Sequence, residues 1–191
     1  MSKLEVRELS IPDIKILTPA IFEDERGSFS ETFSFRALAS VGLEITFVQM
    51  NQSFSRKNGT VRGLHFQRPP SDQDKLVMVT QGSIWDVGVD LRVGSPFYGR
   101  YAGEVISAKA GNQIFIPKGF AHGFCTLEPD TKVVYLVNNY YSAPDDDGLC
   151  WDDPSLALPW PCRPDAATVS DKDRAARSWE SFESPFSFVD A

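Results

Sequence analysis

The 191-residue sequence has only two histidines, His65 and His122, and only three cysteines. Cys125, Cys150 and Cys162 are odd in number and lack C-x-x-C spacing, so we expect neither a disulfide framework nor a zinc knuckle. No apolar stretch approaches the ~20 residues that a membrane span requires. The first residues alternate in charge and do not form an apolar leader. We therefore expect a cytoplasmic protein with reduced thiols.

Runs of basic residues are also absent, and the net charge is −7. Such a chain repels long phosphate backbones and anionic membranes, so we expect neither nucleic acid nor a membrane as partner. A few arginines could still hold a small diphosphate. The Gly-x-Gly-x-x-Gly, P-loop and Gly-x-Ser-x-Gly motifs are missing too. Nicotinamide binding, P-loop phosphoryl transfer and α/β-hydrolase chemistry therefore lack their usual sequence support.

The 42% of hydrophobic and 12% of aromatic residues exclude a disordered chain. Short β-branched and aromatic runs predict strands at residues 14–22, 45–55, 60–67, 76–91, 101–107, 113–116 and 132–141. Regularly spaced turn signals favour a β-sandwich or barrel, in a single domain over residues 1–191. Short helices are predicted at 34–41 and after a capping sequence at 170–173, with a long packed loop at 143–164 between these regions.

Alternation within residues 83–92 places Trp85 and Val87 on one face of a strand and the carboxylates of Asp86 and Asp90 on the other. Two interpretations of the second face remain open. It is either a solvated sheet surface or the lining of a polar cavity inside a barrel.

His65 is a candidate proton carrier, because an imidazole titrates near pH ~6.5. Arg62 and Lys75 lie on adjoining predicted strands, and two cations near an imidazole favour its neutral form, which accepts a proton. The alternative is a hydrogen-bonded core histidine with two surface charges nearby. The His-x-His plus Glu arrangement of metal-binding barrels is missing, since Gly63 and Gln67 flank His65, and we expect no metal.

Two further side chains have both a structural and a catalytic interpretation. Tyr135 interrupts an otherwise aliphatic strand. It is either a core aromatic residue or a second proton carrier that faces His65 across a cavity. Asp173 follows Ser170 at the spacing of a helix cap, which explains this carboxylate without any catalysis.

Eight motifs occur in a recognisable order: DERG (24–27), VQMN (48–51), RGLHFQ (62–67), KLV (75–77), DVGVDLR (86–92), IPKGFAHGF (116–124), WDDP (151–154) and SDKD (170–173). Over residues 12–175 the chain resembles the dTDP-4-dehydrorhamnose 3,5-epimerase family of cupins. This resemblance implies an all-β double-stranded β-helix, the cupin jelly-roll barrel, with an N-terminal strand arm and short C-terminal helices.

The resemblance also implies roles for individual residues. His65 matches the general base, Asp173 the carboxylate that orients it, Tyr135 the phenol that reprotonates from the opposite face, and Lys75 the cation near the developing enolate. The residues implied around the substrate are Arg26, Glu31, Gln49, Asn51, Arg62, Asp86, His122, Tyr140 and Lys172. The implied activity is a cofactor-free inversion of C3, C5 or both in a nucleoside-diphosphate 4-keto-6-deoxyhexose, with dTDP as the nucleotide.

Members of this family are dimers that exchange an N-terminal strand, so the resemblance implies a homodimer here. Two other functions stay open: a single-centre epimerase, and a catalytically silent protein that only binds nucleotide-sugars. Departures from the family pattern occur at Ser28, Gln52, Phe54, Leu136 and residues 145–147. They leave the acid/base set intact but bear on the nucleobase and the sugar.

Overall fold

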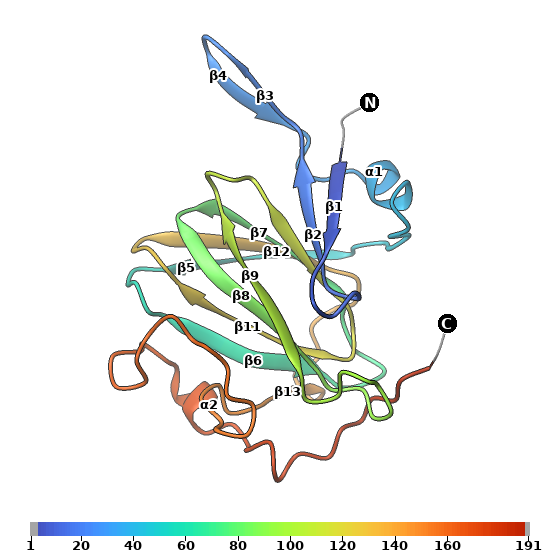
Figure 1. The fold of residues 1–191 in the computed structure, drawn as a ribbon, viewed down its shortest axis with the longest axis vertical. Coiled ribbons are helices and arrows are strands. Elements are labelled where there is room, and N and C mark those ends of the chain that lie inside the picture. Colours follow the sequence, from blue (N-terminus) through green and yellow to red (C-terminus); the bar gives the residue numbers. More distant parts are fainter. Residues whose placement is uncertain (1–3, 190–191) are drawn as a thin grey trace.

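A computed structural model describes residues 4–189 of the protein (Figure 1). Residues 1–3 and 190–191 of the expected domain lie outside the described part. In spatial order, the strands of the first sheet are β1 (Leu4–Glu8), β2 (Lys15–Pro19), β10 (Gln113–Ile116), β7 (Lys75–Gln81), β12 (Thr131–Val137) and β5 (Gln49–Ser55). Those of the second sheet are β13 (Asp146–Gly148), β6 (Val61–Gln67), β11 (Phe120–Thr126), β8 (Ser83–Asp90) and β9 (Tyr101–Ser107).

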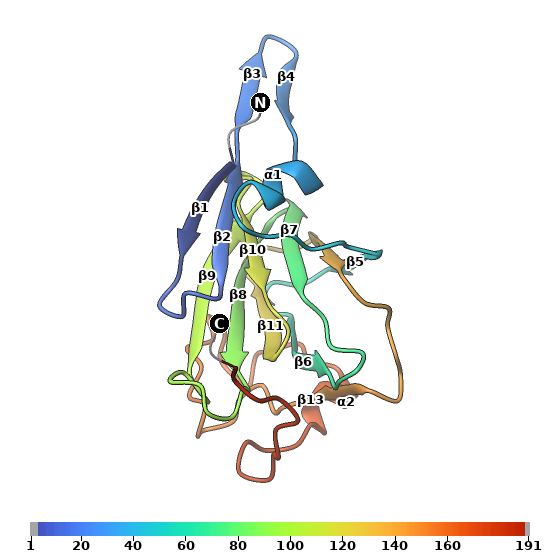
Figure 2. The same cartoon turned by 90° about the vertical axis from the view of Figure 1, so that its right-hand side faces the viewer.

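The two sheets face each other and form the expected jelly-roll barrel. Every pairing between these strands is antiparallel, and several neighbours are far apart in the sequence, such as β2 with β10 and β6 with β11. A separate hairpin of β3 (Ile21–Asp24) and β4 (Gly27–Ser30) projects from one end of the barrel in both ribbon views (Figures 1 and 2). Among residues 4–189, no helix has the length and hydrophobicity needed to cross a bilayer.

Most predicted strands are present, with three corrections. The run at 14–22 contains β2 and the start of β3, which lie in different sheets. The run at 76–91 is two strands, because the chain turns at Gly82, where φ is +81° and a Cβ would lie 2.4 Å from the Thr131 hydroxyl. The strands that carry Arg62 and Lys75 are consecutive but do not adjoin in one sheet, since β6 and β7 lie in opposite sheets. The two side chains therefore approach the barrel interior from different sides.

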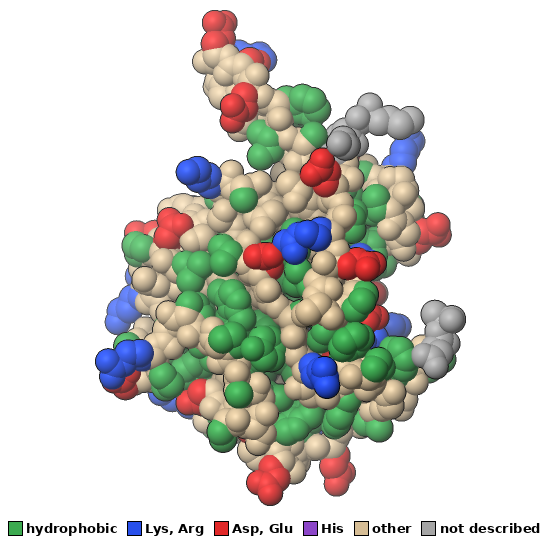
Figure 3. All heavy atoms as spheres, viewed as in Figure 1, with side chains coloured by type: hydrophobic (Ala, Val, Ile, Leu, Met, Phe, Trp, Pro, Cys, Tyr) green, Lys and Arg blue, Asp and Glu red, His purple; other side chains and the backbone are tan. Residues whose placement is uncertain are grey.

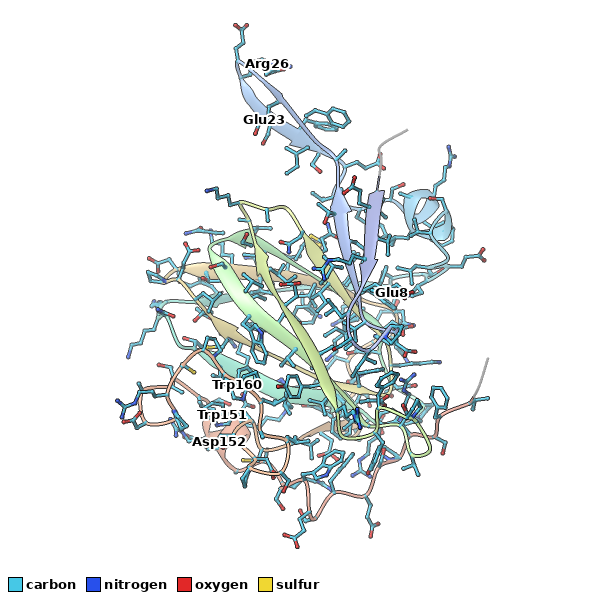
Figure 4. All side chains as sticks on the ribbon, viewed as in Figure 1. Glu8, Glu23, Arg26, Trp151, Asp152 and Trp160 are labelled. Carbon is cyan, nitrogen blue, oxygen red and sulfur yellow. The ribbon has the colours of Figure 1, made fainter. Side chains whose placement is uncertain are left out.

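Both predicted helices begin behind a serine cap, but the second lies within the capping sequence itself, ends at Arg174 and does not continue beyond it. The Ser34 hydroxyl accepts the N–H of Ala37 at the start of α1 (Phe35–Ala39), and Ser170 caps α2 (Asp171–Arg174). Residues 143–164 form the expected packed loop, apart from β13. The indole N–H of Trp160 donates to the Trp151 carbonyl at 2.6 Å, and Figure 4 shows these two residues together beside the lower part of the barrel.

Strand β8 decides between the two interpretations of its carboxylate face. Asp86 and Asp90 are both fully buried, so the face points into the barrel and the solvated interpretation is wrong. On the opposite face, Val87 and Val89 pack with Phe182 and Phe186 of the C-terminal segment. Because both faces of the strand are covered, its polar residues must find partners inside the protein.

Candidate active site

A cavity of about 580 Å³ lies between the two sheets. Its walls come from β5, β7 and β12 of one sheet, from β6 and β11 of the other, and from the segment at 168–173 that contains α2. Figure 2 shows β5, β6 and α2 on the same side of the molecule. His65, Lys75, Tyr135 and Asp173 all line this cavity.

His65 is held by Asp173. The imidazole Nε2 lies 2.7 Å from Asp173 Oδ1, and the Gly63 N–H donates to Oδ2 at 3.3 Å. Burial raises the pKa of Asp173. The hydrogen bonds from His65, from the Gly63 N–H and from the Ser170 hydroxyl, together with the charge of His65, outweigh this effect, so the pKa of Asp173 is lowered overall. The carboxylate therefore stays ionised beside a histidine whose side chain is 35% exposed to the cavity.

Local sequence explains this placement. The Ser170 hydroxyl accepts the backbone N–H of Asp173 at 3.2 Å, so the predicted cap is present and the Asp173 side chain remains available for His65. Gly63 permits the close contact between β6 and β11, since its φ is +130° and a Cβ would lie 2.6 Å from Gly123 Cα. A larger residue at position 63 would push β6, the strand that carries His65, away from β11.

Lys75 is nearly buried at the start of β7, and its Nζ donates to the His65 carbonyl at 3.4 Å. Burial lowers the pKa of this lysine to about 8, an effect that the nearby carboxylates of Asp86 and Asp146 oppose. The ammonium group is therefore charged at neutral pH. The hydrogen bond goes to the backbone of His65, so it fixes the ammonium group beside the strand that carries the imidazole.

Tyr135 enters the cavity from β12, which belongs to the sheet opposite His65. Part of its ring packs against the core between the sheets. Burial raises the pKa of the phenol, partly opposed by Arg62, so the hydroxyl keeps its proton at neutral pH. Tyr135 is thus both a core aromatic and a cavity-lining phenol.

His122 lines the cavity too, but its ring is tied to the barrel interior. Its Nε2 lies 2.9 Å from both carboxylate oxygens of Asp86. Burial lowers the pKa of His122, partly opposed by Asp86, so we assign a neutral imidazole that donates to the carboxylate. Asp86 lies behind His122 and does not itself line the cavity.

The structure brings together most of the residues implied by the resemblance. The substrate-binding candidates that line the cavity are Gln49, Asn51, Arg62, His122 and Lys172. Four others do not line it: Arg26, Glu31, Asp86 and Tyr140. Arg26 lies at the tip of the β3–β4 hairpin, far from the barrel (Figure 4), and Glu31 follows β4.

Several lining residues were not anticipated from the sequence. Tyr141, not Tyr140, lines the cavity, and its hydroxyl donates to Asp146 Oδ2 at 3.0 Å. Asp146 also pairs with Lys172. The sequence signal for Tyr141 was ambiguous, because two adjacent tyrosines follow β12 and the direction of a loop cannot be inferred from periodicity.

Within residues 4–189, no three His, Cys, Asp or Glu side chains cluster in the manner of metal ligands. The expectation of a metal-free site remains a prediction from the sequence.

Comparison with known proteins places this chain in a family. Residues 8–181 match the family model described as dTDP-4-dehydrorhamnose 3,5-epimerase. A protein of that name from Sinorhizobium fredii is 42% identical over 189 residues, which is 99% of this chain and 96% of the relative. The crystal structure of the Bacillus anthracis dTDP-4-dehydrorhamnose 3,5-epimerase, with TDP and PPi bound, is 46% identical with a TM-score of 0.89, covering 92% of this chain and 99% of that one.

A dTDP-6-deoxy-D-glucose-3,5-epimerase from Legionella pneumophila, in complex with dTDP-4-keto-L-rhamnose, has a TM-score of 0.92 at 36% identity, and the likeness covers 99% of this chain and 100% of that one. The chain belongs to the dTDP-4-dehydrorhamnose 3,5-epimerase family.

Proposed function

We propose that this protein catalyses the epimerisation of a dTDP-linked 4-keto-6-deoxyhexose at C3 and C5 without a cofactor. One observation carries the proposal: His65, oriented by a buried carboxylate, shares a cavity with Lys75 and Tyr135, which come from the opposite sheet. The names of the relatives and the ligand of the Legionella neighbour support the substrate class.

His65 acts as the general base. It removes a proton from the sugar carbon beside the C4 ketone and becomes an imidazolium. Asp173 accepts a hydrogen bond from the ring and remains ionised, so it stabilises the positive charge that the ring acquires. The pair therefore resembles a base and its orienting carboxylate in other enzymes.

Lys75 stabilises the enolate. A proton next to a ketone is too weakly acidic for unaided imidazole, so the negative charge that develops on O4 must meet a group already in place. Lys75 is charged at neutral pH, and its burial in the cavity wall strengthens its attraction for an oxyanion.

Tyr135 returns a proton to the opposite face of the same carbon. Inversion requires that the new C–H bond forms on the face from which no proton was taken. Because β12 and β6 lie in opposite sheets, a sugar ring between them would present one face to His65 and the other to Tyr135. Solvent then takes the proton from the His65 imidazolium and returns one to the Tyr135 phenolate, which restores both groups.

The remaining polar walls of the cavity would hold the nucleotide. Arginine forms forked hydrogen bonds to phosphate oxygens, and Arg62 is fixed by the Ser55 hydroxyl and the Phe54 carbonyl at 3.3 and 3.2 Å. We assign Arg62 and Lys172 to the diphosphate, and Tyr141 to contact with the ligand in place of Tyr140.

We further propose a homodimer that acts in the cytoplasm. The projecting hairpin exposes Phe22 by 55% and Phe29 by 70%, and Figure 3 shows hydrophobic side chains on its lower part, below a charged tip. Exposed aromatic pairs on a protruding hairpin are typical of a contact with a second subunit. Arg26 and Glu31 lie on or next to this hairpin, so each would serve the partner's cavity. The three free cysteines fit a reducing compartment.

Deuterium uptake tests the proposed reaction. The protein is incubated with dTDP-4-keto-6-deoxyglucose in heavy water, and the sugar is followed by NMR. We expect label at both C3 and C5 and a product with both centres inverted. Label at one centre alone would identify a single-centre epimerase, and tight binding without any label would identify a silent binding protein.

A further inference from the structure

Gln67, the last residue of β6, has a buried polar side chain that lines the cavity but has no part in the proposed chemistry. It lies two residues after His65 on the same strand, and it faces Asp146 in the register between β6 and β13. A buried amide is costly unless both its donor and its acceptor are used. Its partners therefore show what it does.

Both ends of the Gln67 amide bind the loop that follows β12. The Ser142 N–H donates to Oε1 at 2.7 Å, and Nε2 donates to the Tyr140 carbonyl at 3.2 Å. Nε2 also donates to the Ser71 carbonyl at 2.6 Å. An N–H can only donate and a carbonyl can only accept, so these partners determine which way the amide points.

The two residues that Gln67 holds flank Tyr141. The Tyr141 N–H in turn donates to Gln49 Oε1 at 3.3 Å, so two glutamine amides hold three successive residues. The Tyr141 hydroxyl donates to Asp146, which lies opposite Gln67. The contacts thus close a ring around one cavity-lining side chain.

We propose that Gln67 is a positioning residue for substrate binding, which fixes the backbone on both sides of Tyr141 and so holds that side chain as a wall of the cavity. This inference rests on the proposed function, because it assigns the wall to a nucleotide-sugar. Gln67 acts through Tyr141 and is not a catalytic residue. The requirement for a donor and an acceptor in one side chain explains why an amide stands at this position.

Other hydrogen bonds hold the ends of the same loop. Gln73 donates to the Asn139 carbonyl at 2.8 Å, and the Ser71 hydroxyl donates to Asp145 at 2.6 Å. Loss of the Gln67 contacts should therefore loosen residues 140–142 without unfolding the loop. Gln67→Glu is the sharpest variant, because it keeps the shape and one acceptor but turns an oxygen toward two carbonyls.

A double-mutant cycle tests the inference. For the wild type, Gln67→Glu, Tyr141→Ala and the double variant, KM and kcat are measured with the keto-sugar and the Kd is measured with dTDP. We expect Gln67→Glu to raise KM and Kd roughly tenfold and to leave kcat within about threefold. In the double variant, KM should stay within about threefold of the single variant that has the higher KM, because the effects of two coupled residues on KM do not multiply. Independent, multiplying effects or an unchanged KM in Gln67→Glu would overturn the inference.

Ser95→Ala is the matched control. It also removes a buried hydrogen bond, from the Ser95 hydroxyl to Asp90 at 2.6 Å, but Ser95 does not line the cavity. We expect this variant to lose stability and to keep the KM of the wild type.

Amide hydrogen exchange separates the inference from the proposed function. In the protein without ligand, Gln67→Leu, which removes the acceptor of the Ser142 N–H together with the two donor contacts, should speed exchange of the Ser142 amide, and Ser95→Ala should not. Unchanged exchange at Ser142 would overturn the positioning role of Gln67, whatever the substrate. If exchange is faster in the variant but the wild type neither binds dTDP nor labels the sugar, Gln67 holds the backbone around Tyr141 and the proposed function is wrong.

Discussion

Replacement of Lys75 by methionine should stabilise the protein and inactivate it. A lysine whose pKa falls from 10.5 to about 8 on folding costs about 3 kcal/mol of stability at neutral pH, since one pKa unit corresponds to about 1.4 kcal/mol. Methionine keeps the length of the side chain and needs no hydration. This shift already includes the attraction of Asp86. Because methionine also loses the hydrogen bond to the His65 carbonyl, we expect a net gain of about 1–3 kcal/mol, or roughly 3–10 °C in Tm.

The sign of this effect depends on pH. Below pH 8 the lysine is charged in both the folded and the unfolded chain, so the whole cost is present. Between pH 8 and 10.5 the folded state loses its proton first, and the cost declines. Above that range the lysine is neutral in both states. The advantage of Lys75→Met should therefore be largest near pH 7 and vanish above about pH 10.5.

Denaturant unfolding of both proteins at several pH values measures this advantage, at one protein concentration. Epimerase activity, measured on the same samples, should fall by roughly 10²–10³-fold, the usual effect of removing one group that stabilises an oxyanion. A variant that is less stable than the wild type at pH 7, or one that keeps its activity, would refute the reasoning.

Three further predictions follow from the same site. Because only protonated Lys75 can stabilise the enolate, kcat/KM should fall about tenfold per pH unit above about pH 8. Lys75→Arg should lack this decline. A kcat/KM of the wild type that stays constant up to pH 10 would contradict the assignment. The Asp173 carboxylate accepts a hydrogen bond from His65 at 2.7 Å. Asp173→Asn keeps the size of this side chain but removes its charge, so kcat should drop roughly 10²–10⁴-fold with little change in KM. Steady-state kinetics that show an unaltered kcat would exclude the orienting role. Phe29→Ser on the exposed hairpin should convert the dimer to a monomer in sedimentation, whereas Val105→Ser, at a residue that is 45% exposed on β9, should not; a monomeric wild type would rule out the proposed assembly.

The barrel could be predicted from the sequence wherever strands are short, apolar and separated by turns. β11 was not recognised as a strand, because its sequence combines a histidine and a glycine with aromatic residues. It forms because β6 and β8 pair with it on both sides. The alternation in β8 was correctly described, but periodicity alone could not tell a solvated face from one that points into a barrel.

The acid/base site could be assembled only through the resemblance. His65 and Asp173 are far apart in the sequence and meet because the segment after the long loop returns to β6. Capping explained Asp173 without catalysis, and the structure shows that the cap uses its backbone while the side chain serves His65. The positions of Arg26 and Tyr140 depended on a projecting hairpin and on the path of a loop, neither of which follows from local sequence preferences.

The identity of the base is the central claim, and deuterium exchange in two variants tests it most directly. The keto-sugar is incubated in heavy water with His65→Asn and with Tyr135→Phe, and label at C3 and C5 is measured over time. We predict that His65→Asn loses exchange at both centres, and that Tyr135→Phe keeps exchange but cannot invert at least one centre. Exchange by His65→Asn at the rate of the wild type would show that another group removes the proton.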